Sequence, residues 1–274
     1  MRIAVVQMNT RDDKAANLRR AAELAERAVV RERPDLIAFP ETFAFTGGSV
    51  EARRAAAERF PDGEAYGFLR GLARRHRIWV HGGSLFERDG GTIYNTTVVF
   101  DREGREVARY RKIHRFDVTT PDGRSYRESE LIAAGREVVT YEAEGLVVGC
   151  TICYDLRFAE LYLALARRGV HLVLVPAAFT RETGRDHWEL LLRARAVEIQ
   201  CYVAAPAQWG AFPTPTGTAW THGRSMIVGP WGQVLAQVQD GEGVAACELD
   251  LAYLERVRTL LPVARHRLPP GALS

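Results

Sequence analysis

Short apolar runs alternate with longer amphipathic stretches in the first part of the chain. The run at 2–8 (RIAVVQM) is typical of a strand, and 12–33 carries apolar residues at helical spacing with charges on the opposite face. A second run at 35–40 (DLIAFP) predicts a buried strand, and 64–77 predicts another long helix. The order strand–helix–strand is the unit that builds a pair of parallel strands.

The middle of the chain carries patterns typical of strands joined by turns. Strands are predicted over 78–87, 92–101 and 105–110, with glycine-containing turns between them. The segment 116–130 is polar and rich in turn residues, which predicts a loop that is either functional or merely variable.

The second half repeats the alternation of strands and helices. Strands are predicted over 137–141, 146–153, 171–178 and 201–207, and helices over 156–168 and 185–200. We expect a loop at 209–220, a hairpin at 223–238, a strand at 243–250 and a short helix from Leu251. No linker-like change of composition and no short repeat interrupts the chain, so we predict one α/β domain over 1–274.

Composition and charge exclude several classes of protein. The 274 residues are 47% hydrophobic and 26% charged, which fits a globular protein with a large core. The net charge of +3 is scattered among acidic residues, so we expect neither nucleic acid nor membrane as the main partner. No signal peptide or membrane span is recognised, and four cysteines without a secretion signal indicate reduced thiols in the cytoplasm.

Lysine is scarce in this chain. Of the 37 lysines and arginines only Lys14 and Lys112 are lysines. A lysine that persists where arginine is otherwise used can occupy a place that needs a compact ammonium group. Lys14 lies at a polar helix start and needs no such explanation, whereas Lys112 closes a predicted strand. Lys112 is therefore either a site residue or a solvated strand end.

The stretch LVVGCTICYDLRF (146–158) contains two cysteines three residues apart. If it is a strand, Cys150 and Cys153 point to opposite faces and lie about 10 Å apart, whereas a disulfide needs Cα atoms within about 7 Å. A zinc site needs further ligands, and no other Cys or His pair has ligand spacing. We interpret the pair as coincidental, and expect no metal.

Cys153 is the better placed of the two cysteines, because it ends a strand directly before a predicted helix. Backbone N–H groups and the helix dipole at such a place favour a thiolate. The alternative is an inert buried cysteine, and we assign that role to Cys201 and Cys247, which lie inside apolar strands.

A nucleophilic cysteine needs a base and a charged partner. None of the seven histidines is a convincing base from sequence, His187 and His114 being the nearest candidates. Glu41 follows a buried strand, at a strand end where sites in α/β sheets tend to form, or else is an exposed turn carboxylate.

Three short motifs, FPE, RKIH and CYD-x-RF, occur in this order along the chain. Together they resemble the carbon–nitrogen hydrolases of the nitrilase superfamily, whose Glu–Lys–Cys triad falls on Glu41, Lys112 and Cys153. The resemblance extends over essentially the whole chain, and SYRES matches a second family glutamate, Glu128. Tyr154 and the aspartate after it follow the amidase type. The resemblance implies a four-layer α-β-β-α sandwich that pairs into homodimers.

The resemblance also implies how these residues act, without a cofactor. Cys153 is the nucleophile, and Lys112 lowers the pKa of its thiol and stabilises the oxyanion together with the Tyr154 N–H. Glu41 moves the proton and needs a raised pKa, which a desolvated site supplies. Glu128 orients Lys112 or the substrate.

Within the amidases the similarity is to the branch of deaminated-glutathione amidase and omega-amidase. It implies a small amide with an α-keto acid head, deaminated glutathione first. An ω-amide, an N-carbamoyl amino acid, or a non-catalytic or thiol-redox protein are the alternatives. Phe179 and Thr180 are expected to line the pocket. Arg181, Arg185 and Arg115 are candidate carboxylate binders, or else ordinary solvated arginines; Arg115 departs from the family's apolar residue near the pocket mouth.

Overall fold

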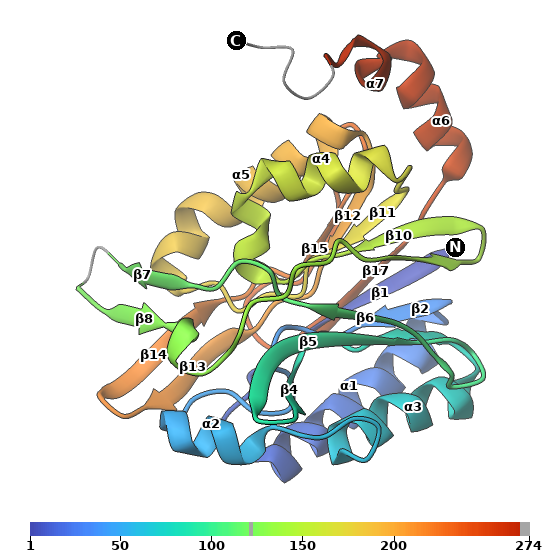
Figure 1. The fold of residues 1–274 in the computed structure, drawn as a ribbon. Coiled ribbons are helices and arrows are strands. Elements are labelled where there is room, and N and C mark those ends of the chain that lie inside the picture. The colour runs from blue at the N-terminus through green and yellow to red at the C-terminus, as the bar shows by residue number, and fades with distance from the viewer. Residues whose placement is uncertain (121–122, 269–274) are drawn as a thin grey trace.

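The computed structural model describes residues 1–120 and 123–268, which form two β-sheets that lie face to face (Figure 1). The first sheet has the order β17-β1-β2-β3-β5-β4, with β6 paired to β5. Its strands are β1 (Arg2–Gln7), β2 (Leu36–Ala38), β3 (Trp79–His81), β4 (Leu85–Asp89), β5 (Thr92–Phe100), β6 (Glu106–Arg111) and β17 (Gly243–Glu248).

The second sheet has the order β16-β15-β12-β11-β10-β9. Its strands are β9 (Thr140–Ala143), β10 (Leu146–Cys150), β11 (Leu172–Leu174), β12 (Tyr202–Ala205), β15 (Met226–Val228) and β16 (Val234–Gln237). In each sheet the central strands are parallel: β1, β2 and β3 in the first, and β10, β11 and β12 in the second.

Helices cover the outer faces of both sheets (Figure 1). On the first sheet lie α1 (Lys14–Glu32) and α3 (Glu64–His76), and on the second α4 (Ala159–Arg167) and α5 (Arg181–Ile199). The chain ends in α6 (Leu251–Leu260) and α7 (Val263–His266) beyond β17. This arrangement confirms the predicted α-β-β-α sandwich.

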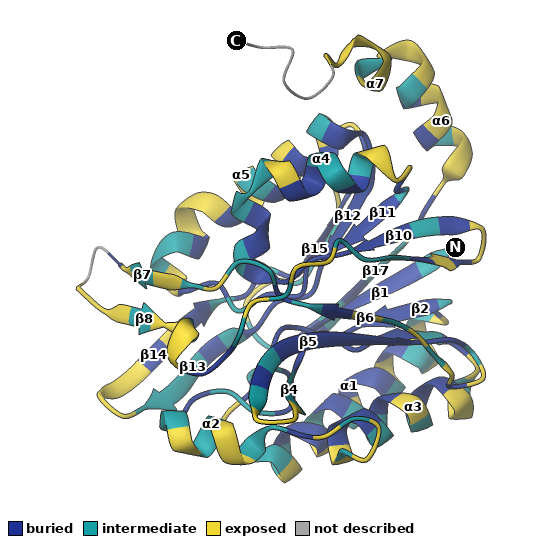
Figure 2. Cartoon of the chain, viewed as in Figure 1, coloured by how far each residue is buried: buried dark blue, intermediate teal, exposed yellow. Residues whose placement is uncertain are grey.

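Alternation along the strands explains the layers. On β1, Ile3 and Val5 pack in the cluster between the sheets with Val148, whereas Ala4 and Val6 pack in the cluster under the helices. Figure 2 shows the strands buried between helices whose outer faces are exposed. No helix among residues 1–120 and 123–268 is long and apolar enough to span a membrane.

The prediction of one strand over 78–87 was wrong, because the chain breaks between β3 and β4. Gly83 has φ +58, and a Cβ at this position would lie 2.1 Å from the carbonyl oxygen of Pro40. The backbone therefore passes directly against the turn that carries Glu41, and Ser84 Oγ accepts the Thr42 N–H at 2.9 Å.

Both predicted loops contain hairpins. Strands β7 (Asp117–Thr119) and β8 (Ser125–Arg127) pair within 116–130, followed by a 3-10 turn at Glu128–Glu130, and residues 121–122 lie outside the described residues. Strands β13 (Trp209–Thr214) and β14 (Gly217–His222) replace the loop at 209–220. Their Gly and Pro residues, which are depleted in strands, hide the strand pattern.

Three helices differ from the sequence prediction. Helix α2 (Val50–Ala56) was missed because it buries no residue and has no apolar stripe. Helix α5 begins at Arg181 rather than 185, where the Thr180 side chain caps the Thr183 N–H. A 3-10 turn at Cys153–Arg157 precedes α4, and strand β10 ends at Cys150, not at 153.

Candidate active site

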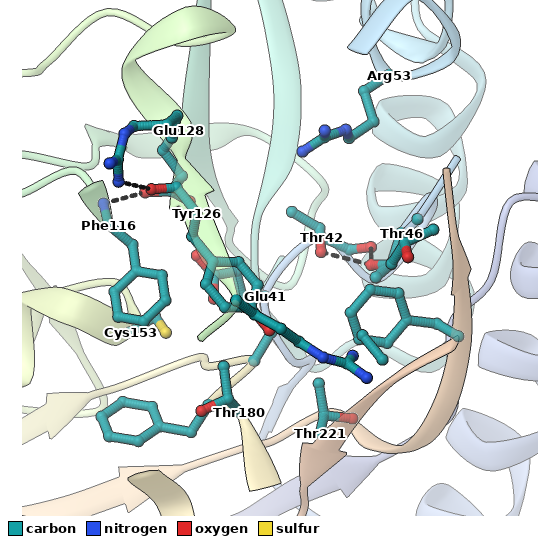
Figure 3. Close-up of a pocket in the computed structure, with 18 of the residues that line it drawn as sticks. Glu41, Thr42, Thr46, Arg53, Phe116, Tyr126, Glu128, Cys153, Thr180 and Thr221 are labelled. Carbon is teal, nitrogen blue, oxygen red and sulfur yellow. Dashed lines mark hydrogen bonds between the residues drawn. The ribbon is translucent and has the colours of Figure 1, made fainter. Parts of the chain in front are cut away.

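The three residues of the predicted triad follow the carboxyl ends of three strands. Glu41 follows β2, Lys112 follows β6 and Cys153 follows β10, and all three line one pocket. Figure 3 labels Glu41 and Cys153 in it. The two facing sheets thus bring together residues that lie far apart in the sequence.

Lys112 is held between two carboxylates. Its Nζ lies 2.9 Å from Glu41 Oε1 and 2.9 Å from each oxygen of Glu128, and its side chain is 1% exposed. Burial by itself would lower the pKa of Lys112, but the charges of Glu128 and Glu41 outweigh burial and raise the pKa well above its ordinary value. Lys112 is a buried cation and not a solvated strand end.

Glu128 connects Lys112 to the polar segment that follows β6. Its Oε2 accepts the Phe116 N–H at 2.7 Å (Figure 3). Burial raises the pKa of Glu128 and the Glu41 charge adds to this, whereas Lys112 opposes the rise. Two carboxylates therefore share one ammonium group in a largely desolvated place.

Glu41 is fixed by two amide side chains that the sequence analysis did not identify. Asn95 Nδ2 donates to Glu41 Oε1 at 2.9 Å, and Gln208 Nε2 donates to the Glu41 carbonyl oxygen at 2.9 Å. Asn95 is 1% exposed and lies inside the apolar strand β5. A polar residue within an apolar strand was the available signal, because a buried amide needs a hydrogen-bond partner.

Cys153 begins the 3-10 turn with a left-handed backbone, φ +48, and its N–H donates to the Pro176 carbonyl at 2.9 Å. Burial raises the pKa of its thiol well above the ordinary value, and the Glu41 charge raises it further, although the Lys112 charge lowers it. The Lys112 charge acts in the predicted direction, but burial outweighs it, so the net pKa of the thiol is raised and not lowered. A raised pKa favours the neutral thiol at rest.

A neutral resting thiol predicts a specific spectroscopic result. The thiolate absorbance of the wild type, with that of Cys153→Ala subtracted, should show no step from neutral pH up to about pH 9, above the ordinary cysteine pKa of about 8.5. The other buried thiols do not interfere, since burial raises the pKa of Cys150 and Cys201 to about 12 and that of Cys247 to about 11. A step near neutral pH would contradict this assignment.

Asp155 anchors the turn that carries Cys153. It is 0% exposed, and its carboxylate accepts from the Tyr110 hydroxyl at 2.6 Å and the Ile152 N–H at 2.9 Å. It also contacts the His114 N–H at 3.0 Å and the His114 Nδ1 at 2.7 Å. His114 is thus engaged in tying the segment after Lys112 to this turn, rather than placed as a base.

The pocket has a volume of about 760 Å³, and both unpredicted hairpins contribute to its walls (Figure 3). Tyr154, Phe179 and Thr180 line it, as expected. Its other lining residues include Thr42, Thr46, Arg53, Phe116, Arg124, Tyr126, Arg127, Glu130, Arg157, Thr183, Phe212, Trp220 and Thr221.

The three arginines expected to bind a carboxylate are not among these lining residues. Arg181 is exposed, with its guanidinium 5.4 Å from the Trp220 ring, and Arg185 is exposed and paired with Asp186 at 3.0 Å. Arg115 is also exposed. The pocket instead carries Arg53, Arg124, Arg127 and Arg157, of which Arg127 and Arg157 belong to the SYRES and CYD-x-RF motifs.

The two cysteines of the pair occupy different surroundings. Cys150 is 0% exposed in the core between the sheets, whereas Cys153 lines the pocket. All four cysteines are free thiols. Within the described part of the chain, no group of three or more His, Cys, Asp or Glu residues is placed to hold a metal ion.

Nearly the whole chain is similar to known proteins of one family. The carbon-nitrogen hydrolase family model matches residues 2–259. A protein of Synechocystis sp. named deaminated glutathione amidase is 40% identical over 270 residues, which are 97% of this chain and 97% of that protein. Omega-amidase NIT2 of Danio rerio is 38% identical over 266 residues, 97% of this chain and 94% of that protein.

Solved structures agree in fold. Saccharomyces cerevisiae Nit3, a member of branch 10 of the nitrilase superfamily, is 32% identical with a TM-score of 0.87, covering 98% of this chain and 97% of that one. A variant of an amidase from Nesterenkonia sp. AN1 is 29% identical with a TM-score of 0.75, covering 98% of this chain and 100% of that one. In that structure acrylamide has added to the active-site cysteine.

Proposed function

The chain belongs to the carbon–nitrogen hydrolase family, and from this premise we propose that it hydrolyses a small amide through a thioester on Cys153. The observation that carries the proposal is a buried lysine, Lys112, held 2.9 Å from both Glu41 and Glu128 in the pocket that Cys153 lines. In this arrangement Glu41 can accept a proton, Lys112 can stabilise an oxyanion, and the Cys153 thiol can act as the nucleophile.

The first half of the reaction forms the acyl-enzyme. Glu41 accepts the thiol proton as Cys153 Sγ attacks the amide carbonyl carbon, because the resting thiol is neutral. Lys112 Nζ and the Tyr154 N–H stabilise the oxyanion of the tetrahedral intermediate. The carbon–nitrogen bond then breaks, Glu41 returns the proton to the leaving amine, and a thioester remains on Cys153.

The second half uses the same groups with water. Glu41 accepts a proton from a water molecule that attacks the thioester carbonyl, and Lys112 again stabilises the oxyanion. The carbon–sulfur bond breaks, the proton returns to Sγ and the acid leaves. The balance is R–CO–NH–R′ plus water giving R–COOH plus R′–NH₂. Glu128 keeps Lys112 in place through both halves, since it contacts Nζ with both oxygens.

Deaminated glutathione is the first candidate substrate. Relatives that match 97% of the chain carry the names deaminated glutathione amidase and omega-amidase, and the pocket, at about 760 Å³, lies within the range typical of small-molecule sites. An α-keto ω-amide is the second candidate and an N-carbamoyl amino acid the third.

A substrate panel separates these candidates. Deaminated glutathione, an α-keto ω-amide, an N-carbamoyl amino acid and a simple aliphatic amide are each incubated with the wild type, and release of amine or ammonia is measured. We expect the highest kcat/KM for deaminated glutathione. A preference for the ω-amide or the carbamoyl compound would reassign the substrate while keeping the reaction, and turnover of none of them would reject the proposal.

The protein is further proposed to form a homodimer in the cytoplasm. Four free thiols support the location. The dimer is supported by exposed apolar side chains on one side of the second helical layer: Leu190 (67% exposed) and Val197 (45%) one above the other on α5, and Trp231 (56%) in the neighbouring β15–β16 turn. Light scattering should give twice the chain mass of 30.6 kDa, and a monomer would reject the dimer.

A further inference from the structure

Arg53, on helix α2, carries a cation on the pocket wall across from Cys153. Figure 3 shows its side chain extending from the helix toward the open space between Glu128 and Thr42. The residue is half-buried, and desolvation lowers the pKa of its guanidinium even though Glu128, Glu130 and Glu51 act in the opposite direction. A desolvated guanidinium stays charged and therefore favours a bound anion.

Arg53 lacks the carboxylate partners that Arg102 and Arg111, two other half-buried arginines, have. Arg102 pairs with Asp35 and Glu144, and Arg111 pairs with Glu87 and Asp89, at distances of 2.7 to 2.8 Å. Among residues 1–120 and 123–268, Arg53 forms no ion pair and makes one long hydrogen bond, from Nε to the Ser49 carbonyl at 3.4 Å. The outer nitrogens of its planar fork are thus available to a ligand in the pocket.

The charge of the pocket lining favours the same kind of ligand. Among the residues that the structure describes, five cationic and three anionic side chains line it, and two of the anions, Glu41 and Glu128, are already bound to Lys112. An amide with no charge would leave Arg53 partly desolvated without a carboxylate partner. A substrate carboxylate would supply one.

We infer that Arg53 binds a carboxylate of the substrate at a distance from the scissile amide, and so selects acidic amides over neutral ones. The inference rests on the proposed function, because it needs the amide carbonyl at Cys153. Deaminated glutathione has two such carboxylates, one on the keto-acid part that stays on the enzyme and one on the leaving peptide. Arg53 would bind either carboxylate in the same way, through charged hydrogen bonds from its guanidinium group.

The test combines a substitution with a change in the substrate. We compare kcat/KM of the wild type, Arg53→Gln and Arg53→Lys for deaminated glutathione and for two analogues, each with one carboxylate converted to a carboxamide. In Arg53→Gln the kcat/KM for deaminated glutathione should fall about 10- to 100-fold, as expected for the loss of a hydrogen bond to a charged group. Most of this change should be a rise in KM. Arg53→Lys should fall between, because it keeps the charge but not the fork.

The two analogues identify which carboxylate is bound. For the analogue that lacks the carboxylate bound by Arg53, Arg53→Gln should change kcat/KM by less than about twofold, since the contact is already absent. An equal loss on all three substrates would show that Arg53 acts through the structure or the field of the site, and would overturn the inference. No loss on the diacid would overturn it equally.

Two controls separate this inference from the proposed reaction. Arg54→Gln alters the neighbouring, exposed arginine of the same helix, which does not line the pocket, and should leave kcat/KM unchanged. If no amide is turned over, binding of deaminated glutathione is measured by calorimetry on Cys153→Ala, with and without Arg53→Gln. About tenfold weaker binding in the double variant would support the anion site even though the reaction fails, and equal binding would reject it.

Discussion

Replacing Cys153 with alanine is expected to abolish amide hydrolysis, with a loss in kcat on the order of 10⁴-fold or more. The reason is that no other thiol lines the pocket within the described part of the chain, and the acyl group has no other attachment point beside Lys112. Release of amine from the best panel substrate measures the loss. Retained turnover in Cys153→Ala would reject the thioester mechanism.

The matched control is Cys150→Ser, three residues earlier in the chain. Cys150 is 0% exposed in the core and does not line the pocket, so this variant should keep activity while losing some stability. A thiol-redox protein would need both cysteines. Equal loss of function in both variants, with both still folded, would therefore favour that class.

Lys112→Met is expected to lose activity and also to destabilise the fold by about 3–5 kcal/mol at neutral pH. Removing the ammonium group leaves two carboxylates, Glu41 and Glu128, with no counter-charge in a place where they are largely desolvated. Urea unfolding of the wild type and the variant measures the free energy of unfolding.

The sign of the pH dependence follows from the same charges. The raised pKa of Lys112 adds stability that is fully present below the ordinary lysine pKa, about 10.4, and is lost only as the pH rises through the folded value. In Lys112→Met the carboxylates are easier to protonate, so that variant should gain stability relative to the wild type as the pH falls from about 8 to 5. If the difference in free energy of unfolding between the wild type and Lys112→Met grew as the pH fell, this explanation would be contradicted.

Lys14→Met is the control for the loss of a lysine. Lys14 Nζ is bonded to Glu58 at 3.0 Å and to the Ala56 carbonyl at 2.8 Å, away from the catalytic pocket. Glu58 also accepts the Ala65 and Tyr66 N–H groups, so it keeps partners after the change. We expect a smaller loss of stability and unchanged activity.

The sequence was sufficient to nominate the reacting groups but not their surroundings. Glu41, Lys112 and Cys153 follow strands, and their motifs are local, so position along the chain reveals them. Asn95 binds a carboxylate 54 residues away in the sequence, and Arg53 lines a pocket formed by several segments. Such contacts exist only once the two sheets face each other.

The same distinction separates the correct and incorrect parts of the fold prediction. Long segments such as α1 and β5 were predicted correctly, because burial dictates their residues, on one face in α1 and along most of the strand in β5. The hairpin β7–β8 was missed because its strands have three residues each with exposed ends, and β13–β14 because Gly and Pro residues interrupt its strand pattern. The predicted effect of Lys112 on the pKa of Cys153 is present, but burial outweighs it, and the extent of burial is not visible in the sequence around a single cysteine.

The thioester on Cys153 is tested most directly by identifying the residue that carries the acyl group. Wild-type protein is quenched in acid during steady-state turnover of the best substrate, digested and analysed by tandem mass spectrometry. The thioester mechanism predicts that Cys153 carries an added mass equal to the acyl portion of the substrate. Hydroxylamine should remove this acyl group, and Cys153→Ala should not form it. Turnover that continues in Cys153→Ala, or an acyl group on a different residue, would contradict the mechanism.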